Sequence, residues 1–91
     1  MLSIRAEPAG DRWVCSVKVQ DRGQETEHRV RVHPEDLERW GRGPGRQDVE
    51  DLVRRSFAFL LEREPQGSIL REFDLATIRR YFPEYDDEFR R

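Results

Sequence analysis

The chain has 91 residues, of which 35% are hydrophobic and 40% are charged, and its formal net charge at pH 7 is −2. This length supports one compact core, so we expect a single domain over residues 1–91. The near balance of charge argues against a dedicated polyanion binder, and no apolar run reaches the roughly 20 residues that cross a bilayer. We therefore expect a folded protein with no membrane-spanning role.

Cys15 is the only cysteine, which excludes an intrachain disulfide and a cysteine-based metal cluster. A lone cysteine is typical of proteins from a reducing compartment. The first residues, 1–6, alternate apolar and polar side chains instead of joining a basic segment to an apolar run, so we expect no signal peptide. Together these features predict a cytoplasmic protein.

Three runs within residues 1–33 alternate apolar with polar side chains, which is the period of a half-buried strand. Glycine-containing turns separate the runs. The inward set is Leu2, Ile4, Ala6, Trp13, Cys15, Val17, Val19, Thr26, His28, Val30 and Val32. We predict a three-stranded antiparallel meander over residues 1–33.

Even-length turns at 9–10 and 22–23 keep every inward side chain on one face of this meander. The predicted cross-strand neighbours on that face are Ile4 with Cys15, Trp13 with Val32, and Val17 with His28. On the outer face the same turns pair Glu7 with Arg12 and Lys18 with Glu27, which complement each other in charge.

A short helix is expected over residues 34–40, because Pro34 suits a first helical turn, and residues 41–47 then form a loop rich in glycine. The main helix is expected over 48–64, with Asp48 as its N-cap. Its apolar residues recur at helical spacing: Val49, Leu52, Val53, Phe57, Leu60 and Leu61. This stripe is wide enough to cover the apolar face of the sheet.

Residues 68–83 are expected to form a packed turn and a final helix, which Asp74 caps and Pro83 ends. The buried side of that helix would be Leu75, Ile78, Tyr81 and Phe82. Residues 84–91 form an acidic and aromatic tail that we expect to fray, although Tyr85 can pack back. The predicted fold class is α+β: a three-stranded antiparallel meander followed by two or three helices packed on one face.

The outer face of the predicted sheet carries more basic than acidic side chains. The basic ones are Arg5, Arg12, Lys18, Arg29 and Arg31, and the acidic ones are Glu7, Glu25 and Glu27. Small sheets can bind nucleic acid on such a face, but they usually interleave aromatic side chains for base stacking. None points outward here, so these five basic residues are a candidate surface for a partner or for nucleic acid, and an ordinary solvated face is the competing interpretation.

No arrangement of residues indicates catalysis or a cofactor. The alternation turns His28 inward and leaves His33 at the end of its strand, so the two imidazoles diverge and predict no metal site. Cys15 lies mid-strand among apolar neighbours, whereas a nucleophile needs an exposed, electropositive setting. The glycines of residues 41–45 follow no strand and fit no phosphate-binding pattern. We predict no catalytic residue, no metal and no cofactor, and hence no enzyme.

From Phe59 onward the sequence contains the words FLLEREP, ILREFDL and YFPEY. In these words the chain resembles the end of a group of small bacterial proteins, over about a third of its length. The resemblance implies a natural bacterial protein with a packed C-terminal half. Because no activity is attached to that group, no functional residue is transferred from it.

These observations favour a non-catalytic interaction or regulatory module that acts through protein–protein association. The first strand, expected over residues 2–7, lies at an open sheet edge and lacks an internal proline, so it can pair with another chain. The partner would be another protein or a second copy, because symmetric pairing is the commonest oligomer. The segment Tyr81–Phe89 offers a second contact. The alternative is a nucleic-acid-binding domain that uses the basic outer face.

Overall fold

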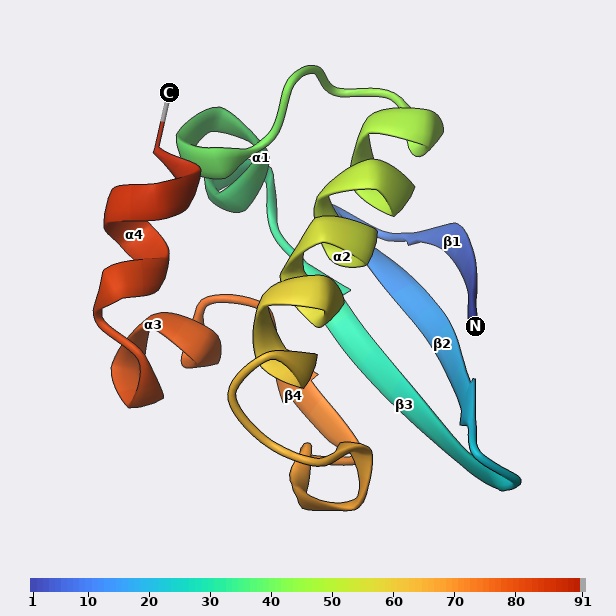
Figure 1. Ribbon diagram of the computed structural model, residues 1–91. Coiled ribbons are helices and arrows are strands. Elements are labelled where there is room, and N and C mark those ends of the chain that lie inside the picture. Colours follow the sequence, from blue (N-terminus) through green and yellow to red (C-terminus); the bar gives the residue numbers. More distant parts are fainter. Residues whose placement is uncertain (91) are drawn as a thin grey trace.

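The structure, a computed structural model, describes residues 1–90 and has an α+β fold built on one four-stranded sheet (Figure 1). This confirms the predicted fold class. In Figure 1 the long helix α2 crosses one face of the sheet, and α1 and α4 lie next to one another beside it. Arg91, the last residue of the expected tail, lies outside the described residues. Across residues 1–90, none of the helices combines the length and apolar character needed to traverse a bilayer.

The predicted three-stranded antiparallel meander is present. Strands β1 (Leu2–Ala9), β2 (Arg12–Asp21) and β3 (Gln24–Val32) pair in antiparallel order. Along each strand the inward residues are buried or half-buried and the outward ones are mostly exposed, because successive side chains point to opposite faces of a sheet. The alternation in the sequence therefore predicts correctly which side chains of each strand point into the core.

One of the two predicted registers is wrong by two residues. Between β2 and β3 the pairs Trp13 with Val32 and Val17 with His28 are confirmed. Between β1 and β2, however, Ile4 lies opposite Val17 instead of Cys15. The outer pair Lys18 with Glu27 is confirmed, whereas Glu7 lies opposite Val14 and not opposite Arg12.

The two turns explain this difference. Arg22 and Gly23 both have positive φ, at 53° and 78°, which is the conformation of a two-residue type I′ hairpin turn. In the first hairpin Gly10 has the positive φ, and the turn centres on Gly10 and Asp11, one residue later than predicted. A shift of two in the pairing leaves every side chain on its predicted face.

A fourth strand, β4 (Glu72–Asp74), was not predicted. It pairs in parallel with β3 and places Phe73 beside Val30. The interpretation of Asp74 as a helix cap is wrong, because Asp74 belongs to this strand and lies opposite Arg31. The strand occupies part of the second sheet edge, which the meander alone would leave open.

The two predicted helices α1 (Pro34–Trp40) and α2 (Arg46–Leu61) are present, although α2 begins and ends earlier than expected. Gly45 is the N-cap of α2, and the Gly45 N–H donates to the carboxylate of Asp48, three residues on, at 3.0 Å. Asp48 is therefore the third residue of the helix and not its cap. A carboxylate in the first turn still stabilises the positive end of the helix dipole.

The C-terminal segment contains more structure than expected. After the short 3₁₀ turn η1 (Gln66–Ser68) and β4 come α3 (Thr77–Tyr81) and α4 (Glu84–Phe89). The tail therefore does not fray over its described residues, since α4 buries Tyr85 completely. The expectation that Tyr81 is buried is also wrong: its side chain is 67% exposed.

One hydrophobic cluster joins the sheet to all four helices. Phe57 of α2 lies at its centre, with its ring centroid 5.3 Å from that of His28 and 6.2 Å from that of Phe73. The core thus continues from the meander through α2 to β4.

Candidate functional site

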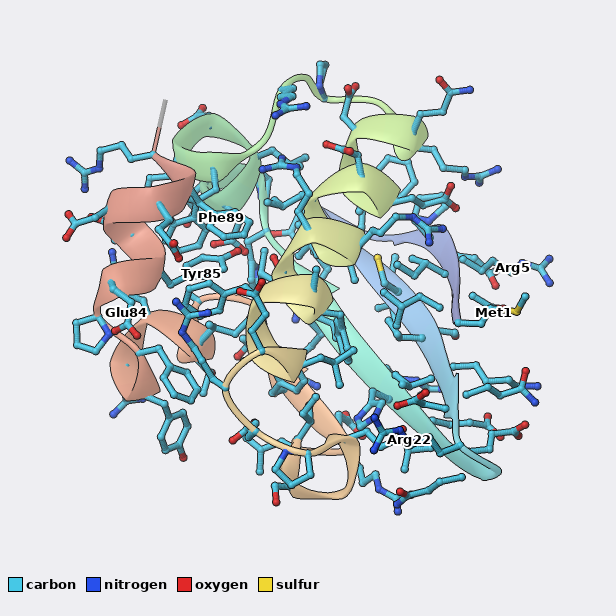
Figure 2. The ribbon with its side chains drawn as sticks, viewed as in Figure 1. Met1, Arg5, Arg22, Glu84, Tyr85 and Phe89 are labelled. Carbon is cyan, nitrogen blue, oxygen red and sulfur yellow. The ribbon has the colours of Figure 1, made fainter. Side chains whose placement is uncertain are left out.

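The five basic residues proposed from the sequence all lie on the outer face of the sheet, but most of them have acidic neighbours. Arg5 lies 3.6 Å from Glu7, Arg12 lies 3.4 Å from Asp11, and Lys18 lies 3.9 Å from Glu25. Figure 2 shows Arg5 projecting outward from β1, away from α2. These exposed ion pairs contribute little to the stability of the fold, but they reduce the positive electrostatic potential of this face.

Arg31 is held more firmly than the other four basic residues. Its guanidinium donates to Asp74 and to Glu72, each at 2.7 Å. The hydrogen bond from Arg31 is the main reason why the pKa of Asp74 lies below its ordinary value. Since β4 adds these two carboxylates, the outer face carries five acidic side chains against the five basic ones predicted.

A shallow hollow of about 400 Å³ remains on this face. Its lining includes Ser3 and Ser16, the acidic side chain of Glu27, and the basic side chains of Arg5, Lys18, Arg29 and Arg71. Within residues 1–90, Arg29 and Arg71 form no ion pair. Arg71 was not among the predicted residues, because its place beside Arg29 depends on the parallel pairing of β4.

The free edge of β1 was predicted to be open to another chain. Met1 and Gln20 exchange backbone hydrogen bonds across β1 and β2. Because such bonded pairs alternate along an antiparallel ladder, the intervening residues of β1 direct their backbone groups to the free edge. These residues are Leu2, Ile4, Ala6 and Pro8.

Side chains from α2 already occupy part of this edge. The Ala6 N–H donates to the carboxylate of Glu50 at 2.9 Å, and Arg54 donates to the carbonyl of Leu2 at 3.4 Å. Pro8 has no N–H to offer. A strand added here would have to displace both side chains and would find no donor at Pro8, so the edge is blunted against pairing.

The residues weighed as metal ligands do not converge. His28 points into the core, His33 lies 3.3 Å from Asp74, and Cys15 is buried. In the described part of the chain no three His, Cys, Asp or Glu side chains form a group that could hold a metal ion. Burial, with a smaller contribution from Glu50, raises the pKa of the Cys15 thiol to about 12, which is the setting of an inert structural cysteine.

Helix α4 is attached to the body through buried polar contacts. The Ser56 hydroxyl donates to the carbonyl of Leu52, so the Tyr85 hydroxyl, 2.7 Å away, donates to Ser56. The indole N–H of Trp40 donates to Asp86 at 3.0 Å. Figure 2 shows Tyr85 and Phe89 pointing from α4 toward α2. The two aromatic side chains of α4 thus cover the core, with Tyr85 fully buried and Phe89 half-buried.

An apolar groove of about 310 Å³ lies between the end of α2, the segment from η1 to β4, and α3. The apolar side chains that form its floor and walls are Leu60, Ile69, Phe73, Ile78 and Phe82. Leu70 and Tyr81 border it and are 47% and 67% exposed. Large apolar side chains gathered around a recess are typical of interaction sites, whereas single exposed ones are ordinary.

Buried hydrogen bonds hold one wall of this groove against the sheet. The Gln66 amide donates to the Thr26 hydroxyl at 3.2 Å, and that hydroxyl lies 2.9 Å from Nε2 of His28. Nδ1 of His28 faces the carbonyl of Leu70 at 2.8 Å and must carry a proton to bond it, so Nε2 can accept from Thr26. This series of hydrogen bonds holds the backbone of Leu70 in place, so this wall of the groove is preformed.

Sequence reasoning missed the groove, because its apolar residues have the pattern of core residues. Leu75 and Tyr81 were both assigned to the buried side of one helix, yet Leu75 is fully buried and Tyr81 is not. The spacing of apolar residues predicts a face, but it does not reveal how much of that face the rest of the chain covers.

Comparisons with known proteins add no family or relative to this description. The chain matches no protein-family model, and it matches neither a curated protein nor a solved structure. The candidate site therefore depends on its own geometry.

Proposed function

We propose that this protein is a non-catalytic interaction module that binds a protein partner through the groove between α2 and α3. The observation that carries the proposal is the groove itself, a preformed apolar recess with the exposed side chains of Leu70 and Tyr81 at its border. Binding an apolar or aromatic side chain there would remove these surfaces from water, and aromatic anchors in such pockets supply most of the energy of many interfaces.

Selection of displayed random peptides on the immobilised chain tests this function. The wild-type chain should enrich peptides with an aromatic or aliphatic anchor, and Leu70→Glu should abolish their binding because it places a charge at the border of the apolar recess. Gln47→Glu is the matched control, since it adds the same charge at an exposed position of α2 that lines neither the groove nor the hollow. Enrichment of no peptide family, or of peptides that bind Leu70→Glu equally well, would refute the proposal.

The second candidate function is nucleic-acid binding on the outer sheet face, and the hollow with Arg29 and Arg71 is the observation that favours it. Both guanidiniums are available for phosphate oxygens, which Arg binds in bidentate fashion. The balanced charge of the face and the absence of Phe, Tyr and Trp from the described lining of the hollow count against it.

A gel-shift titration with single- and double-stranded probes at low salt separates the two functions. If nucleic acid is the ligand, replacing Arg29 and Arg71 together by Glu should abolish a salt-sensitive shift. These residues test the idea more cleanly than Arg31, whose replacement would also break its contacts with Glu72 and Asp74. Absence of any shift at low salt would exclude this function.

A further inference from the structure

The surface around the groove carries both a recess and a projection. The recess is apolar, and Tyr81, the last residue of α3, extends from its border with 67% of its side chain exposed. Leu70 projects from the segment before β4. A surface that holds a projection and a complementary recess can pair with itself around a two-fold axis, because each copy then inserts its projection into the other.

Charged residues next to the groove complement each other in the same way. Glu64 lines the recess, and Arg80 precedes Tyr81 and is exposed. Within the part of the chain that the structure describes, neither residue forms an ion pair. Because Arg80 is next to Tyr81 in the sequence, insertion of Tyr81 into the recess of a second copy would bring Arg80 toward the Glu64 that lines that recess. Two-fold symmetry repeats this contact.

From this complementarity we infer that the partner in the groove is a second copy of this chain, in a symmetric dimer built on reciprocal insertion of Tyr81. The inference rests on the proposed function of the groove and specifies its partner. The free edge of β1 is the competing site for self-association, but Glu50, Arg54 and Pro8 blunt it. The groove requires no such displacement.

Sedimentation analysis from low micromolar to near millimolar concentration tests the dimer. The wild-type chain should shift from the monomer mass to twice that mass as concentration rises. Tyr81→Ala should weaken the association by at least about 30-fold, which is the effect of removing an aromatic hot spot. Circular dichroism should show that this variant keeps its fold, because the Tyr81 side chain is mostly exposed.

A charge-reversal experiment tests the symmetry of the contact. Glu64→Arg alone and Arg80→Glu alone each place like charges opposite one another in both halves of the dimer, so each should stay monomeric at concentrations where the wild type associates. A one-to-one mixture of the two variants restores opposite charges at both contacts and should associate again. Glu38→Arg, an exposed change on α1, serves as the control and should dimerise normally.

A wild-type chain that keeps the monomer mass at every concentration would overturn the dimer, and so would a dimer that tolerates Tyr81→Ala. A mixture of the two charge variants that stays monomeric would overturn the reciprocal contact. If the chain is monomeric and the wild type still selects Leu70-dependent peptides, the partner is a different protein and the proposed function stands. If no such peptides are selected either, the proposed function fails as well.

Discussion

The outer sheet face and the groove beside α3 differ in how many of their side chains find partners within the chain. On the outer face Arg31 is bound by two carboxylates, and Arg5, Arg12 and Lys18 each have an acidic neighbour. Around the groove, Leu70 and Tyr81 remain exposed beside an apolar recess. The richest charge pattern in the sequence is therefore largely balanced within the fold, and the uncovered surface is apolar.

The comparison also shows how an exposed surface can be held rigidly. The groove has a floor of buried core residues, and the hydrogen-bonded chain from Gln66 through Thr26 and His28 fixes one of its walls. The cations of the outer face stand on strands but extend into solvent on long side chains. A preformed site loses less conformational entropy on binding than a set of mobile side chains does.

The largest expected effect comes from the ring of Phe57, which packs between the inner face of the sheet and the groove. Phe57→Ala removes a fully buried side chain that contacts His28 on the sheet and Phe73 at the groove. The free energy of unfolding should fall by about 3 to 5 kcal/mol, as for other buried Phe truncations. Denaturant titration measures this change. Leu61→Ala, on the same helix but partly exposed, is the control and should change stability by less than half as much.

A smaller loss should follow from releasing the groove wall while leaving the outer face intact. Gln66→Ala removes a buried amide that donates to the carbonyl of Val19 and to the Thr26 hydroxyl. Stability should decrease by about 1 to 3 kcal/mol, because buried acceptors lose their donor. The rate of amide hydrogen exchange should increase more at residues 66–71 than in β1 and β2.

The matched change for this experiment is Gln20→Ala, which removes an exposed amide whose side-chain partner, among residues 1–90, is Glu25. It should leave stability within about 0.5 kcal/mol of the wild type. Equal exchange rates at residues 66–71 in Gln66→Ala and in the wild type would show that the hydrogen-bonded chain does not fix the groove wall.

The ion pair between Asp74 and Arg31 on the outer face should contribute less than about 1 kcal/mol to the free energy of unfolding, because Asp74 is partly exposed. This contribution should depend on pH. The folded pKa of Asp74 lies below its ordinary value, so its contribution to stability is present above that value and is lost as the pH falls through the folded pKa. Asp74→Asn should therefore be less stable than the wild type near neutral pH, and the difference should disappear as the pH falls through the lowered pKa of Asp74. A difference that grows on acidification would contradict this assignment.

The smallest expected effect on stability is at the border of the groove. Leu70→Glu replaces a half-exposed side chain and should change the free energy of unfolding by no more than about 0.5 kcal/mol. The same variant should lose partner binding, so folding and binding separate at this residue. A large loss of stability would instead identify Leu70 as part of the core.

The sequence predicted the sheet better than the segment that follows it. Period-two alternation identifies a strand and its two faces, and the turn at Arg22 and Gly23 set the correct register because both residues adopt positive φ. The first turn could be placed at either of two neighbouring positions. Only the faces, and not the pairing of Ile4, followed from the pattern.

The missing elements depend on contacts between residues far apart in the chain. Strand β4 has three residues, too few to show alternation, and its partner β3 precedes it by about 40 residues. Because β4 was not predicted, the contacts of Arg31 with Glu72 and Asp74 were not predicted either. For the same reason Arg71 was not included in the candidate surface. The groove was hidden for the same reason, because the exposure of Tyr81 depends on how α3 packs against its neighbours.

The groove and the sheet are alternative surfaces for association of this protein, and the groove is the one that we expect it to use. A dilution series of proton–nitrogen correlation spectra tests this expectation most directly, since each backbone amide reports its own environment. Concentration-dependent shifts should occur in residues 60–64, 68–73 and 77–82, while strands β1 and β2 should stay unchanged. Shifts gathered on β1 or on the outer face around Arg29 would contradict it.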